Sequence, residues 1–158
     1  MSKVIKNMSR AKEVKIEGYD KPFKFDLSDK RVNNKALHLV LYIKGIADKQ
    51  AKIIEEANKI EDLLERKVFI SDKELEILTE LKNMINDLFD FPITDAMFGT
   101  GCTPEVYRYT ELFEQLHPIF EEVVKEQQEQ IKNFKKQYGL DRIIKPNEED
   151  TQKFFAEA

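Results

Sequence analysis

The stretch that decides the fold runs from Ser28 to Leu64 and reads SDKRVNNKALHLVLYIKGIADKQAKIIEEANKIEDLL. Its apolar residues recur mostly at steps of three and four, which places them along one face of an α-helix. The residues of this stripe are Val32, Ala36, Leu39, Val40, Ile43, Ala47, Ile54, Ala57, Ile60 and Leu64. Ser28 is a plausible N-cap, so the first helix is expected to begin there. At roughly 35 residues it would exceed ordinary globular lengths, which indicates either a hairpin of long helices or a seam that meets a partner.

Gly45 lies inside the stripe and predicts a break or a close contact, because glycine costs about 1 kcal/mol relative to alanine in a helix.

The residues before this stretch predict a β-hairpin over 13–27. Residues 13–17 and 23–27 each alternate polar and apolar side chains, and the turn-like sequence 18–22 lies between them. One face would carry Val14, Ile16, Phe23, Phe25 and Leu27. A two-stranded hairpin is marginal alone, so this face should pack on the helices or on another subunit. Residues 1–12 are polar and basic, and we expect them to form a flexible arm.

Two further helices are expected downstream. Ser71 and Glu74 fit a capping box, which predicts that a second helix begins at Ser71. This helix should end near Phe91, because Pro92 disfavours a helical conformation in the residue before it. A short helical turn over 92–97 and a break at 99–101 are expected to follow.

The third helix is predicted to begin at Thr103, with Pro104 in the first helical position. Pro118 should kink or split it, and Gly139 is a good C-terminal cap. Together these elements predict a mostly α fold, an antiparallel bundle of long helices with a short N-terminal β-hairpin, over residues 13–144. Residues 145–158 form an acidic tail, for which a disordered state and a short helix from Asn147 both remain open.

Composition and charge bear on the class of protein. The 158 residues carry a formal net charge of −4 and the lysines are interleaved with glutamates, which argues against the basic face of a nucleic-acid binder. The single cysteine excludes an intrachain disulfide and favours a reducing, cytoplasmic setting. The N-terminus lacks the apolar region of a signal peptide, and the longest apolar run, 39–43, is too short to cross a membrane.

Residues of the reactive types are few. Cys102 precedes a predicted helix N-terminus, a position that can lower a thiol pKa, but nothing in the sequence brings His38 or His117 near it. A small buried residue in a tight loop is the favoured interpretation. Glu114 lies three residues before His117, but His38 has no carboxylate at that spacing, so the paired Glu-x-x-His motifs of a two-metal helical site are absent from the sequence. We therefore expect no catalytic, metal or cofactor residues.

The last predicted helix is the first candidate for a binding surface. Its stripe is narrow and interrupted by three glutamines, which suits either a helix that meets a partner or an ordinary core helix. The candidate protein-binding residues on it are Phe120, Val123, Ile131, Phe134 and Tyr138. Phe154 and Phe155 in the acidic tail have two interpretations, a short docking motif or part of a disordered end.

The order of elements also resembles a known family. A hairpin with Gly18-Tyr19 and 23–27 leads into helices, Phe98-Gly99 follows, and a helix with 107–113 precedes a long helix rich in Glu, Gln and Lys. Over about residues 13–140 this resembles the small tail assembly chaperones of long-tailed bacteriophages and prophages of Gram-positive hosts. The resemblance implies a helical, self-associating protein in the host cytoplasm that binds the tape measure protein, a long hydrophobic helical rod, before the tail tube polymerises around it.

The function expected on this basis is non-enzymatic. The chain would act as a tail assembly chaperone that binds the tape measure protein, the tail tube subunits or both. It would form a homo-oligomer and would bind neither nucleic acid nor membranes. A structural virion component and a helical protein–protein adaptor are the alternatives.

Overall fold

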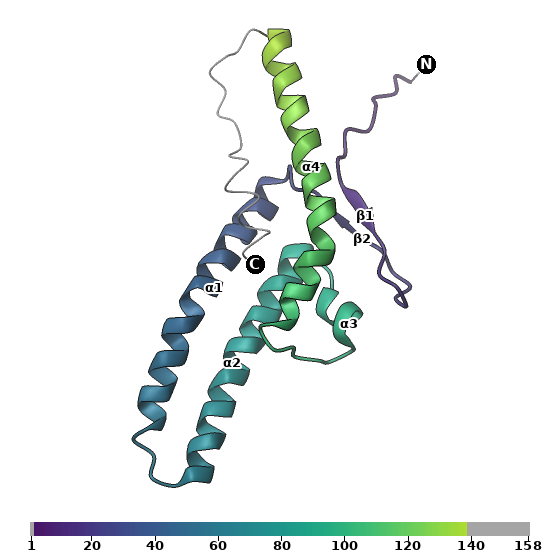
Figure 1. Cartoon of the computed structure of the whole chain (residues 1–158). Helices are drawn as coiled ribbons and strands as arrows, with labels where there is room; N and C mark the ends of the chain where they lie inside the picture. The colour runs from purple at the N-terminus through teal and green to yellow at the C-terminus, as the bar shows by residue number, and fades with distance from the viewer. Residues whose placement is uncertain (1, 139–158) are drawn as a thin grey trace.

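Two long antiparallel helices, α1 (Lys30–Ala57) and α2 (Leu63–Phe89), form the largest part of the fold, as Figure 1 shows. The structure is a computed structural model that describes residues 2–138. The predicted N-cap of the first helix is wrong. Asp29 caps α1, because its carboxylate accepts a hydrogen bond from the Arg31 backbone N–H at 2.9 Å, and the Ser28 hydroxyl donates to Asp26 instead.

The hairpin of long helices is the correct alternative for the stretch 28–64, because the turn at 58–62 divides it. Asp62 caps α2 by accepting from the Glu65 N–H at 2.8 Å, and the Arg66 guanidinium donates to the Ile60 carbonyl at 2.7 Å across the turn. The predicted start at Ser71 is therefore wrong, and the capping-box residues lie inside α2. The break predicted at Gly45 is also wrong, since α1 continues through it and an added Cβ would meet nothing within 4 Å.

The end of α2 and the following turn agree with the sequence. The helix ends at Phe89, and Asp90 adopts a left-handed conformation with φ 47°. A single short helix, α3 (Ile93–Phe98), follows after Pro92. Gly99 and Gly101 have positive φ angles of 109° and 77°, which an L side chain rarely adopts, so the chain breaks there as predicted.

The last helix, α4 (Arg108–Tyr138), begins later than predicted. Thr103 does not cap it. Residues 105–107 form tight turns in which each carbonyl accepts from the N–H three residues later, and regular α-helix follows only from Arg108. The helix is continuous through Pro118, so the predicted split is wrong. The predicted end at Gly139 lies outside the described residues.

The predicted hairpin is confirmed, with β1 (Lys12–Val14) antiparallel to β2 (Phe23–Phe25). Phe23 and Phe25 are buried against the helices, where the Phe25 ring centroid lies 4.9 Å from Phe89 and 5.2 Å from Phe120. The hairpin therefore joins α2 to α4. The mostly α fold is confirmed, and the core lies at one end of the α1–α2 hairpin, where the strands, α3 and α4 gather.

The arm was predicted over 1–12, but Lys12 begins β1; residues 2–11 contain no helix or strand and are largely exposed. Val4 and Ile5 are almost fully exposed.

Candidate protein-binding surface

The predicted binding residues of α4 do not share one environment. Phe120 is only 1% exposed and lies in the core between Phe25 and Phe89. Further along the helix, Ile131 is partly exposed and Phe134 is 46% exposed. Val123 and Tyr138 also belong to α4. Phe154 and Phe155 lie outside the described residues.

The structure presents a second apolar surface that sequence reasoning did not separate from the core. It lies toward the turn at 58–62, and we call it the tip face. Its members are Ile54 of α1 and Leu64, Val68 and Leu75 of α2. Their exposed fractions run from 47% for Ile54 to 71% for Leu64. Scattered exposed leucines need no explanation, but aligned ones on one face point to an interaction surface.

Helical geometry places these residues on the side of the hairpin that carries the rest of the molecule. Eighteen residues make five full turns of α-helix, so Leu64 lies on the same side of α2 as Lys82, and Val68 on the same side as Asn86. Both of these later residues contact α3. Lys82 Nζ lies 3.7 Å from Asp95, and Asn86 Oδ1 accepts from Thr94 at 3.1 Å. The tip face is therefore the uncovered continuation of the face that α3 covers near the core.

The α1 member of the tip face faces the same way. Ile54 lies five turns beyond Ala36, which is buried in the core cluster. Lys35 contacts Asp87, and Tyr42 contacts Ile77 and Glu80, which fixes the antiparallel register of α1 and α2. The same register brings Ile54 to the level of Val68. Residues from both helices thus contribute to one surface.

The other broad face of the hairpin is polar. The Tyr42 hydroxyl donates to Glu80 at 3.1 Å and to the Ile77 carbonyl at 3.2 Å, and Lys49 Nζ lies 3.9 Å from the Tyr42 ring centroid. Burial, followed by the Glu80 carboxylate, raises the pKa of Tyr42 to about 12. Of these two broad faces, the tip face is the more apolar.

A row of carboxylates runs beside the tip face on α2. Glu65, Asp72 and Glu76 are exposed and spaced seven and four residues apart, which places them on one side of the helix. Of these three, within the described residues, only Glu76 forms an ion pair, with Lys73 Nζ at 3.6 Å. A partner on the tip face would meet negative charge along this edge.

A second exposed apolar pair lies on the side of α1 that faces away from α2. Leu37 and Leu41 are one turn apart and mostly exposed. Lys44 and Asp48 follow one and two turns further along this side, so the pair is short. It provides matched positions for control substitutions.

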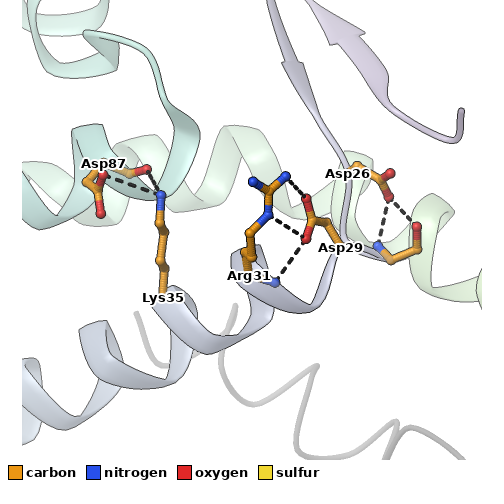
Figure 2. A network of polar contacts seen from close by, with 6 residues as sticks. Asp26, Asp29, Arg31, Lys35 and Asp87 are labelled. Carbon is orange, nitrogen blue, oxygen red and sulfur yellow. Dashed lines mark hydrogen bonds and ion pairs between the residues drawn. The ribbon is translucent and has the colours of Figure 1, made fainter.

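At the start of α1, charged side chains form hydrogen bonds and ion pairs with one another (Figure 2). The Arg31 guanidinium donates to Asp29 at 2.9 Å and, with the Arg31 N–H, keeps the pKa of that carboxyl below its usual range. Lys35 Nζ lies 3.3 Å from the Asp87 carboxylate, and Asp26 accepts from Ser28. Because the Asp29 carboxylate occupies the helix N-terminus, an anion has no place there. We interpret the cluster as structural.

An open pocket of about 320 Å³ with a mixed polar and apolar lining lies between the β-hairpin and the helices α3 and α4. Val14, Ile16, Met97 and Ile119 are among its lining residues. The lining contains no histidine or cysteine, so it lacks the nucleophile and base considered from the sequence.

The candidate reactive residues also remain apart from one another. Cys102 is partly exposed, and its backbone N–H donates to Gly99. His38 is exposed on α1, and His117 Nδ1 lies 3.5 Å from Glu121. Burial, followed by the neighbouring Cys102, raises the pKa of Tyr109 to about 12. Within residues 2–138, no histidine forms a hydrogen bond with Cys102, and no group of three or more His, Cys, Asp and Glu residues could hold a metal ion.

Comparisons with protein-family models, curated proteins and solved structures find no match for this chain. Across the described helices, none combines the length and apolar character of a membrane span.

Proposed function

We propose that this chain is a non-enzymatic binding protein that holds a helical protein client against the tip face. The observation that carries the proposal is the exposed row of Leu64, Val68 and Leu75 on α2, joined by Ile54 on α1. Two antiparallel helices offer the shallow apolar surface on which an amphipathic helix lies in helix-in-groove recognition. The high charge of the remaining surface supports a role in keeping such a client soluble.

The specific client that we propose is a phage tape measure protein, with the chain acting as a tail assembly chaperone in the cytoplasm of a bacterial host. The family resemblance supports the tape measure protein as the client. The tip face supports binding of such a client, because an exposed apolar surface suits a long apolar helical rod. Tail tube subunits are a second candidate client.

Co-expression with the tape measure protein of the same phage or prophage tests the proposal. The chain should keep the rod in solution and co-purify with it. Leu75→Asp should abolish capture, because a charge would be buried against an apolar helix. Leu41→Asp is the matched control, since it places the same charge at an exposed leucine on the outer side of α1. If the two variants capture the rod equally well, the tip face is not the binding surface.

A structural virion component is the competing function. That role requires the chain in purified finished particles, whereas an assembly chaperone should be absent from them. Recovery of stoichiometric chain in mature tails would reject the chaperone proposal.

A further inference from the structure

Cys102 lies in the loop that joins α3 to α4, and hydrogen bonds fix the backbone of this loop. The Cys102 N–H donates to the Gly99 carbonyl at 3.1 Å, and the Gly101 N–H donates to the Asp95 carboxylate at 3.1 Å. Both glycines have positive φ angles, which allow the loop to turn tightly. The thiol is partly exposed, so a small reagent in solution can reach it.

The hydroxyl of Tyr109 is buried beside this loop. Tyr109 is 2% exposed, and within the described residues its buried hydroxyl has no hydrogen-bond partner. Its ring packs edge-on against Phe98, with centroids 5.8 Å apart, and Phe98 directly precedes the glycine whose carbonyl accepts from Cys102. Cys102 also acts electrostatically on the phenol, since it follows burial among the causes that raise the pKa of Tyr109. The thiol and the hydroxyl are therefore neighbours.

An unpartnered hydroxyl at this position is unfavourable for the fold. It gives up its hydrogen bonds to water on folding and gains none in return, whereas most buried polar groups are paired. A phenylalanine ring would fill the same space without that cost. The hydroxyl gains a partner if the neighbouring Cys102 carries an acceptor in another chemical state. A thiol sulfur is a weak acceptor, but an oxygen bonded to that sulfur is a strong one.

We propose that Cys102 is a site of reversible oxidation by hydrogen peroxide, and that the Tyr109 hydroxyl donates a hydrogen bond to the oxygen of the resulting sulfenic acid. The thiolate sulfur attacks one peroxide oxygen, so an S–O bond forms and the O–O bond breaks. The other oxygen leaves as hydroxide and takes up the proton that the thiol released, which gives water. Sulfur loses two electrons in this step, and the peroxide gains them.

Reversal uses an external thiol such as glutathione. The sulfenic acid condenses with one thiol to a mixed disulfide and water, and a second thiol then releases the Cys102 thiol. Cys102 is the single cysteine of the sequence, so no other cysteine of the chain competes for the sulfenic acid. The modification goes beyond the proposed binding function and does not depend on it, because neither Cys102 nor Tyr109 belongs to the tip face.

The test follows the sulfenic acid of the full chain over time. The reduced protein is treated with hydrogen peroxide, the excess peroxide is removed with catalase, and samples taken at intervals are mixed with a cyclic 1,3-diketone, which labels sulfenic acids selectively. The mass of the intact protein gives the labelled fraction, and Cys102→Ser gives the background from other oxidised residues. The labelled fraction should decay about three times more slowly in the wild type than in Tyr109→Phe, the factor expected for one hydrogen bond of modest net strength.

Tyr107→Phe is the matched control, because Tyr107 is two residues away and 68% exposed. Its labelled fraction should decay at the wild-type rate. Denaturant unfolding of the reduced proteins provides a second measurement. Since Tyr109→Phe removes a hydroxyl without a partner, its unfolding midpoint should equal or exceed that of the wild type.

Four results would overturn the proposal. The first is a wild type that acquires no label, and the second is equal decay in the wild type and Tyr109→Phe. The third is a Tyr107→Phe variant that decays as fast as Tyr109→Phe, because the effect would then not be specific to the buried hydroxyl. The fourth is a lower unfolding midpoint for reduced Tyr109→Phe, because the hydroxyl would then already have a partner when Cys102 is reduced.

Discussion

Replacing Phe120 with alanine should destabilise the fold by about 3–5 kcal/mol, the range for removing a buried phenylalanine side chain. Phe120 is 1% exposed, and its ring centroid lies 5.2 Å from Phe25 and 6.5 Å from Phe89. It therefore touches the β-hairpin and α2 from α4, and its removal leaves a cavity where three elements meet. Each aromatic pair contributes about 0.5–1.5 kcal/mol beyond the buried area, which places the loss toward the upper end of the range.

The loss would be a large share of the total stability, since single domains unfold at a cost of about 5–15 kcal/mol. The assay is denaturant unfolding followed by circular dichroism, in which the midpoint should fall while the slope stays constant. Phe134→Ala is the matched control from the same helix. Because Phe134 is 46% exposed, its removal should cost about 1 kcal/mol or less.

Equal losses for the two variants would refute the placement of Phe120 in the core. A Phe120→Ala loss below about 1 kcal/mol would do the same. The experiment also separates two roles for the α4 stripe. If Phe120 were a contact for a client, its alanine variant would lose binding while keeping its stability.

Three further outcomes are expected. Asp62→Ala should cost about 1 kcal/mol in denaturant unfolding because it removes the α2 N-cap, whereas Ser71→Ala inside the helix should cost only a few tenths. Gly45→Ala should stabilise the protein by roughly 0.5–1 kcal/mol in the same assay, because α1 is continuous there and the space is open. The folded pKa values of Tyr42 and Tyr109 are raised to about 12, so the folded protein keeps phenol protons that the unfolded chain releases above pH 10. Stability from these tyrosines should be complete below pH 10 and fall between pH 10 and about 12, and Tyr42→Phe should reduce that fall without abolishing it.

The sequence predicted the elements better than it predicted where they begin. The hairpin of 13–27 and the mostly α fold follow from alternating and helical apolar spacing, and both are confirmed. The predicted N-caps Ser28 and Ser71 are wrong, because neighbouring residues such as Asp29 and Asp62 have side chains equally suited to capping a helix. Asp62 and Ser71 both have side chains suited to an N-cap, and Ser71 also has Glu74 three residues later. The helix begins after Asp62, because packing of α2 on α1 extends it to the earlier of the two positions.

The tip face could not be found by the same means. Ala36 and Ile54 both belong to the stripe predicted from periodicity, and they lie on the same side of α1. One is buried and the other is 47% exposed, because α3, α4 and the strands cover only one end of the α1–α2 hairpin. Periodicity shows which side of a helix is apolar. Which part of that side is buried depends on tertiary contacts, and these cannot be read from the spacing of residues.

The tip face consists of apolar residues that packing between α1 and α2 does not use. The fully buried core residues of α2 end at Ile77, and nearer the turn Phe69 and Ile70 are partly buried against the same cluster. Hairpin stability requires apolar residues along the seam between α1 and α2, a requirement met by Ile46, Ile53 and Ala57. It does not require Leu64 or Leu75, which point away from that seam and remain more than half exposed. Apolar side chains that the seam does not require, aligned beside an acidic row, are the structural basis on which a binding role is proposed.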